Sequence, residues 1–154
     1  MDILEIIYTL KDNYYKYISI LGHLDSNHIK NYQDCYPEEI DKYIRRLTRI
    51  EDEVIEFRLK KILKEEHPYI PIIHADKIKL SNIYPNLSFP EVIDHFLKQR
   101  RGLLKFLEKL PKEKWVRTGV HEKEGHVEFK EYVERLTKRD ASIIEELESL
   151  KKPV

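Results

Sequence analysis

A chain of 154 residues fits a single domain, residues 1–154, because a domain of about this size buries enough apolar surface to fold alone. Its 28 basic and 28 acidic side chains cancel to a formal net charge of zero, so no overall field indicates binding to nucleic acid or to an anionic membrane. Charges recur every few positions, which excludes an apolar run of the roughly 20 residues that span a bilayer.

Cysteine usage and the first residues bear on location. Cys35 is the single cysteine and cannot form an internal disulfide. Residues 1–10 lack the basic start and the small-residue cleavage site of a signal peptide, so we expect a cytoplasmic protein. The 36% share of charged residues, with frequent Ile, Lys and Glu, is typical of heat-adapted proteins.

The first two predicted helices cover residues 2–22 and 37–66. In both, apolar residues recur at steps of three and four, which places them on one face of a helix. The second begins at Pro37, a favoured first-turn residue, followed by two acidic residues that suit the positive end of the helix dipole. Pro68 is expected to stop it.

The remaining predicted helices cover residues 88–111 and 127–151. The earlier one has a start signal, because Ser88 precedes Pro90 and stands three residues before Glu91, as in a capping box. Four amphipathic helices bury their apolar faces together most readily as a bundle, so the sequence predicts an all-α fold. Residues 68–87 are apolar enough to pack over it as a long crossover between the second and third helices.

Histidine spacing gives no metal site. The chain has seven histidines, and no two within one predicted helix stand three or four residues apart. His74, His95 and His121 would form a site only if the fold brought them together. No glycine-rich loop precedes a helix, so no phosphate-binding loop is expected.

A set of residues resembles the DinB-like superfamily of four-helix bundles. The resemblance covers about two-thirds of the chain, and it rests on Glu51, Phe57, Arg58, Arg100, Trp115, Arg117, Gly119, His121, Gly125, Glu131 and Asp140. It implies a DinB-like four-helix bundle, often a homodimer. In the enzymes of the family, three histidines hold a divalent metal such as nickel or zinc for thiol-dependent transfer or isomerisation.

This chain departs from that ligand pattern. Where the family has His-Leu-x-x-x-Glu, the chain has Arg46 through Glu51, and where it has His-Asp-x-x-His, the chain has Arg139, Asp140 and, at the last position, Ile143. Arginine stays protonated and isoleucine has no donor atom, so none of the three replacements ligates a metal. We therefore expect no metal and no cofactor at these positions, and we expect His121 to hydrogen-bond its own loop.

The charges at family positions lack local partners. No acidic residue stands three or four positions from Arg46, Arg58, Arg100 or Arg139, and no basic residue from Glu51 or Asp140. Buried guanidiniums need a counter-charge. One interpretation is an internal network of these arginines with Glu51 and Asp140. The other is an anion site in which Arg46 and Arg139 meet and grip a phosphate or carboxylate.

The function expected from the sequence is binding rather than catalysis. The chain is predicted to be a metal-free DinB-like protein that binds a small anionic ligand or a protein partner, and to form a homodimer. The candidate ligand-binding residues are Arg46, Glu51, Arg58, Arg100, His121, Arg139 and Asp140. The alternative is a divalent-metal-dependent thiol transferase or isomerase with a relocated set of ligands.

Overall fold

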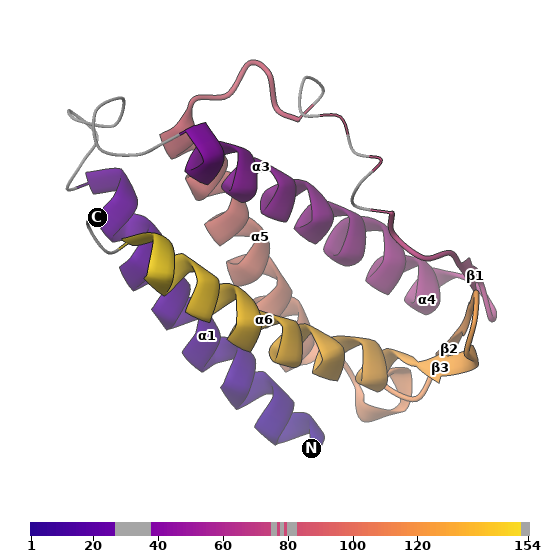
Figure 1. Ribbon diagram of the computed structural model, residues 1–154. Coiled ribbons are helices and arrows are strands. Elements are labelled where there is room, and N and C mark those ends of the chain that lie inside the picture. Colours follow the sequence, from indigo (N-terminus) through magenta and orange to yellow (C-terminus); the bar gives the residue numbers. More distant parts are fainter. Residues whose placement is uncertain (27–37, 75–76, 78, 80–82, 152–154) are drawn as a thin grey trace.

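The computed structural model describes residues 1–26, 38–74, 77, 79 and 83–151, and most of these residues are helical (Figure 1). Four long helical segments occupy the predicted places. Their elements are α1 (Ile3–Ser26), the uninterrupted run of α3 (Glu38–Asp52), η2 (Glu53–Leu59) and α4 (Lys60–Lys64), then α5 (Phe89–Lys109) and α6 (Phe129–Lys151). No helix in the described part of the chain is long and apolar enough to cross a membrane.

The start of α5 is fixed by the predicted capping box. The Ser88 hydroxyl accepts a hydrogen bond from the Glu91 backbone N–H, and the Glu91 carboxylate accepts one from the Ser88 backbone N–H. Pro90 stands in the first turn, where its missing N–H costs nothing. Because each group satisfies a donor that the helix would leave unpaired, the local sequence sets this boundary.

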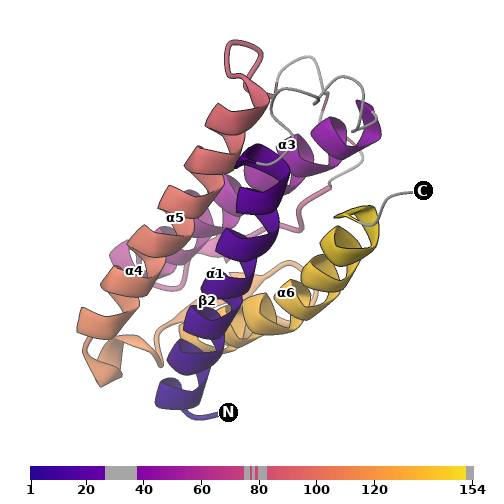
Figure 2. The same cartoon turned by 90° about the vertical axis from the view of Figure 1, so that its left-hand side faces the viewer.

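The direction of the helices explains the long crossover. Figures 1 and 2 show that α1 and α6 run one way and that α3 and α5 run the other. Arg45 contacts the chain at Leu87, just before α5, and Asp52, seven residues later, contacts Gln99 within α5. Two successive helices that run in the same direction need a connection that returns along their whole length.

A small sheet replaces part of what was expected to be loop and helix. β1 (Tyr69–Ile70) pairs in parallel with β2 (Thr118–His121), which pairs antiparallel with β3 (Gly125–Glu128). The fold is mostly helical, as predicted, but this sheet means that it is not all-α, and residues 127 and 128, assigned to the last helix, lie in β3. The sheet joins the crossover to the α5–α6 connection, a long-range pairing that no local pattern predicts.

One glycine allows the strands to approach. A Cβ atom at Gly119 would lie 2.8 Å from the Ile70 side chain and 3.1 Å from that of Ile62, so a larger residue would push β1 away from β2. Ile70 and Ile83 are buried, as a packed crossover requires, whereas Ile78 falls outside the described residues.

The core fills the space between the helices along their length. Four apolar residues, one or more from each of α3, α5 and α6, are buried, which confirms the predicted apolar faces of these helices: Leu47, Phe96, Leu136 and Leu147. Ile143 is also buried, and it packs in the cluster that holds Leu47.

Candidate functional site

A buried ion-pair network lies between the helices. The Arg100 guanidinium, on α5, donates from Nε to Glu51 of α3 at 2.8 Å, and from Nη1 and Nη2 to the two oxygens of Asp140 on α6 at 2.7 and 2.6 Å. Glu51 and Asp140 have no exposed surface, and Arg100 is 2% exposed. Charges at this depth persist only when paired and hydrogen-bonded, and here they are.

The first helix joins the same network. The Tyr17 hydroxyl donates to Asp140 at 2.7 Å, and the Asn13 side-chain amide donates to it at 3.1 Å. The Arg100 guanidinium also lies 5.2 Å from the centre of the Tyr17 ring and 5.6 Å from that of Phe96, within cation–π range. One buried cluster therefore connects α1, α3, α5 and α6.

Formal charges in the network cancel. Arg139 donates from Nη2 to the second Glu51 oxygen, so two arginines face two carboxylates. Burial alone would raise the pKa of Glu51, but the charges and hydrogen bonds of Arg100 and Arg139 outweigh it and hold that pKa below its ordinary value. The network needs no bound anion for balance, so it is the internal network that the sequence allowed.

Next to this network, η2 changes the spacing of side chains. In a π-helix the backbone hydrogen bonds join residues that are five positions apart. Arg58 Nε accordingly lies 3.7 Å from a carboxylate oxygen of Glu53, five positions earlier. The sequence did not predict this ion pair, because acidic residues three or four positions from an arginine are its expected partners in an α-helix. Arg58 also donates from Nη1 to the Pro71 carbonyl of the crossover.

A cavity of about 290 Å³ is lined by residues of η2, β2 and α6 and by Ile72 and Ile73 of the crossover. Four of the residues that line it carry a basic side chain: Arg58 from η2, His121 from β2, and Arg135 and Arg139 from α6. The rest of the lining is apolar apart from one phenol: Val54, Leu59, Ile72, Ile73, Tyr132 and Leu136.

Three buried polar groups on this lining have no hydrogen-bond partner: Arg58 Nε, Arg139 Nε and the Tyr132 hydroxyl. Only one other side-chain atom of this kind, Trp115 Nε1, occurs among the residues that the structure describes. An unpaired buried polar group costs about 1–3 kcal/mol, so its presence asks for an explanation such as a ligand. Burial raises the pKa of Tyr132, so its hydroxyl keeps its proton and can donate.

His121, which lines the same cavity, is held by its own loop. Its Nδ1 accepts hydrogen bonds from the backbone N–H groups of Lys123 and Glu124, at 3.1 and 3.2 Å, which confirms that it binds its own loop. A neutral imidazole whose Nδ1 accepts carries its proton on Nε2. The ring is therefore oriented by the turn between β2 and β3.

The structure separates the predicted site residues into three groups. Glu51, Arg100 and Asp140 form the closed network, and Arg58 and His121 line the cavity, while Arg139 belongs to both. Arg46 is exposed and does not line the cavity, so the cavity is not the alternative anion site in which Arg46 and Arg139 meet.

Two cavity residues were missed from the sequence. Arg135 pairs with Glu131, four positions away, and so resembles an ordinary surface charge, although it also binds Glu124 bidentately at 2.6 and 2.7 Å. Tyr132 has no distinguishing neighbours in the sequence. Arg135 and Tyr132 precede Arg139 by four and seven residues, which places all three on one face of α6. This spacing is the feature of the sequence that could have predicted their proximity.

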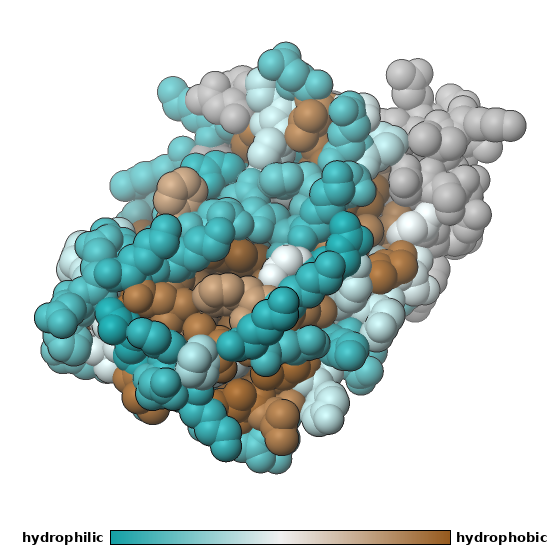
Figure 3. Space-filling model, turned by 180° about the vertical axis from the view of Figure 1, so that it is seen from behind, coloured by the Kyte–Doolittle hydropathy of each residue, from teal (hydrophilic) through white to brown (hydrophobic). Residues whose placement is uncertain are grey.

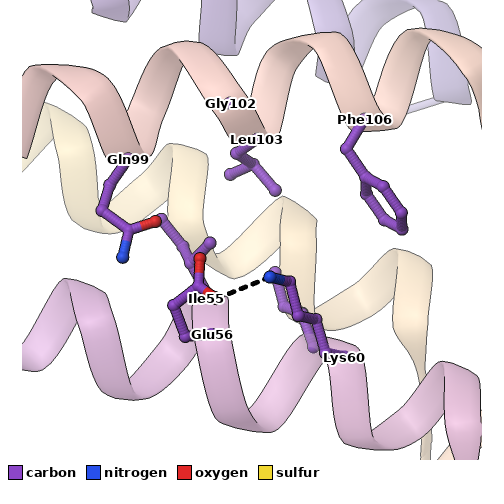
Figure 4. Close-up of a pocket in the computed structure, with 8 residues that line it drawn as sticks. Ile55, Glu56, Lys60, Gln99, Gly102, Leu103 and Phe106 are labelled. Carbon is purple, nitrogen blue, oxygen red and sulfur yellow. Dashed lines mark hydrogen bonds and ion pairs between the residues drawn. The ribbon is translucent and has the colours of Figure 1, made fainter.

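A second cavity, of about 270 Å³, lies between α5 and the η2–α4 run (Figure 4). Its lining is apolar around Leu103 and Phe106, and its polar groups have partners: Glu56 pairs with Lys60, and Gln99 donates to Asp52. The face behind that of Figure 1 also exposes apolar side chains in its middle, framed by hydrophilic ones (Figure 3). Neither feature offers the unpaired donors of the first cavity.

The histidines considered for a relocated metal site stay apart. His95 contacts the Asp52 carboxylate at 2.9 and 3.0 Å, His121 binds its loop, and His74 is exposed. Within the described ranges, no group of three or more His, Cys, Asp or Glu side chains is placed to hold a metal ion. Cys35 and His28 lie outside those ranges.

Comparison with protein-family models, with curated proteins and with solved structures found no match to this chain.

Proposed function

We propose that the protein is a DinB-like four-helix bundle that binds a small anionic ligand, without a metal, in the cavity between η2, α6 and the sheet. The observation that carries the proposal is a group of buried donors without a hydrogen-bond partner, on Arg58, Tyr132 and Arg139, all residues lining one cavity. Of these donors, Arg58 Nε has only a long ion pair with Glu53, at 3.7 Å. The up–down–down–up order of the helices and their long crossover support the bundle.

The lining favours an anion over a cation or a neutral molecule. Guanidinium groups bind carboxylate and phosphate through paired N–H donors, and a phenol and an imidazole N–H add further donors. Each arginine of the lining already has a carboxylate partner, and Arg135 has two, so the cavity is not strongly positive. Its free donors therefore suit a single small anionic group.

The apolar part of the lining limits the rest of the ligand. Val54, Leu59, Ile72, Ile73 and Leu136 leave little polar surface beyond the basic side chains. A cavity of about 290 Å³ is at the small end of ligand sites. A short-chain carboxylate fits this combination better than inorganic phosphate does.

Thermal unfolding in matched ionic strength tests the proposal. Butyrate should raise the melting temperature more than acetate or phosphate does, and each more than chloride, because a ligand that binds only the folded state stabilises it. The gain is about 1.4 kcal/mol at ten times the dissociation constant. If all four anions behave alike, the cavity does not bind anions.

A matched pair of arginine variants locates the effect. Arg58→Gln should remove the difference between butyrate and chloride, whereas Arg46→Gln, at an exposed position away from the cavity, should leave it unchanged. Loss of the difference in the Arg46 variant would place the anion elsewhere. The expected homodimer stays a prediction, which light scattering over a range of protein concentrations tests.

A further inference from the structure

A histidine pair lies on the sheet, away from the cavity. His67 Nδ1 stands 2.9 Å from the Thr118 hydroxyl oxygen, and His126 Nδ1 stands 3.0 Å from the same oxygen. The two imidazole rings are 5.1 Å apart between centroids and nearly perpendicular. Two nitrogens from distant parts of the chain therefore converge on one hydroxyl, and both histidines are exposed to solvent.

The small sheet creates this convergence. Thr118 begins β2 and His126 lies on β3 opposite Val120, so both side chains stand on one face of the hairpin. His67 lies in the turn between α4 and β1, and its backbone there has a φ of +46°. A residue before proline normally adopts an extended backbone, so the contacts with the sheet hold His67 in an unusual conformation.

The two hydrogen bonds to the Thr118 hydroxyl place each imidazole nitrogen at a distance from that oxygen that neighbouring metal ligands also have. Neighbouring ligands at about 2.1 Å from an octahedral metal stand about 3.0 Å from each other, and around a tetrahedral metal about 3.4 Å. The two nitrogen–oxygen distances, 2.9 and 3.0 Å, fall at the octahedral value. Imidazole nitrogen suits zinc, nickel and copper, whereas magnesium and calcium prefer oxygen ligands.

We propose that His67 and His126, with the Thr118 hydroxyl between them, bind a divalent transition-metal ion, and that water completes its coordination. The site uses none of the residues assigned to the anion cavity, so either proposal stands or fails without the other. It also uses none of the positions at which the DinB-like family holds its metal.

Calorimetric titration of the untagged protein with Zn²⁺, and separately with Ni²⁺, tests the site. Wild type should bind each metal, and Mg²⁺ should give no heat of binding. His67→Ala and His126→Ala should each weaken Zn²⁺ binding about 10-fold or more, because losing even an outer partner of a ligand costs about that much. Thr118→Val should weaken it less, since a hydroxyl is the poorest of the three ligands.

His74→Ala is the matched control, because His74 is exposed and lies outside the cluster. It should bind Zn²⁺ as wild type does. Circular dichroism of each variant checks that it is folded, and a double His67→Ala, His126→Ala variant serves if a single one gives an ambiguous titration. Equal Zn²⁺ affinity in the folded double variant and wild type, or no Zn²⁺ binding by wild type, would leave the cluster a hydrogen-bonded His–Thr–His contact only.

Discussion

The buried network and the cavity next to it use the same kinds of residue in opposite ways. Around Arg100, all three nitrogens of the guanidinium donate to carboxylates, and the formal charges cancel when Arg139 is included. Around the cavity, Arg58 Nε and the Tyr132 hydroxyl are equally hidden from water and have no hydrogen-bond partner, although Arg58 Nε forms an ion pair with Glu53 at 3.7 Å. Arg139 joins the two, with Nη2 bound to Glu51 and Nε unpaired.

The two regions differ in whether their donors have hydrogen-bond partners, rather than in the kinds of charge that they contain. A fully paired network fixes how the four helices pack against one another. A ligand could bind there only by breaking hydrogen bonds that are already formed. Unpaired donors beside an empty volume cost stability in the free protein, and a ligand that pairs them recovers it. Three predictions test this contrast, in order of decreasing effect.

Removing the centre of the network should have the largest effect. Arg100→Ala leaves Glu51 and Asp140 buried with one fewer cation, and breaking a buried ion pair from one side costs about 3–5 kcal/mol. Its neighbour Arg101 is exposed, and Arg101→Ala should change stability by no more than about 0.5 kcal/mol. Urea unfolding followed by circular dichroism measures both, and similar costs for the two variants would contradict a structural role for Arg100.

The same chemical change at two tyrosines compares the regions directly. Tyr17→Phe removes a hydrogen bond to the Asp140 carboxylate, which is worth about 1.5–3 kcal/mol. Tyr132→Phe removes a hydroxyl that has no partner, so without ligand it should be neutral within about 0.5 kcal/mol or stabilising. With butyrate present, Tyr132→Phe should lose part of the ligand-induced rise in melting temperature. Equal costs for both variants without ligand would show that the Tyr132 hydroxyl is paired in solution.

Acidification should weaken the network through Glu51. Its folded-state pKa lies below the unfolded value of about 4.3, so the stability that it contributes is present above that value and is lost as the pH falls through the folded pKa. The loss amounts to about 1.4 kcal/mol for each unit of difference between the two pKa values. Unfolding free energies from pH 7 to pH 3 measure it.

A matched pair of glutamine variants isolates the contribution of Glu51. Glu51→Gln should flatten the acid limb of the stability curve, whereas Glu108→Gln, on the exposed side of α5, should leave its slope as in wild type. A wild-type curve that rises on acidification would have the wrong sign for a depressed pKa.

The secondary structure could be predicted where its causes are local. The Ser88–Glu91 capping box, the apolar faces that bury Leu47 and Phe96, and the breaks at proline all act within a few residues. The sheet could not, because β1 and β2 are about fifty residues apart and each is too short to show a pattern. The site was predicted in part: the unpaired charges of Glu51, Arg100 and Asp140 correctly indicated partners on other helices.

The sequence by itself thus determined which segments are helical, where α5 begins, and which charges must find distant partners. The tertiary structure alone decided what those partners are. In the folded protein Arg100 binds two carboxylates, and Arg139 belongs to both the closed network and the lining of the cavity. Arg58 pairs with Glu53 across a π-helical turn, and Arg46 is exposed. The physical reason is that periodicity and caps act over one or two turns of helix, whereas the partner of a buried charge depends on how whole helices pack.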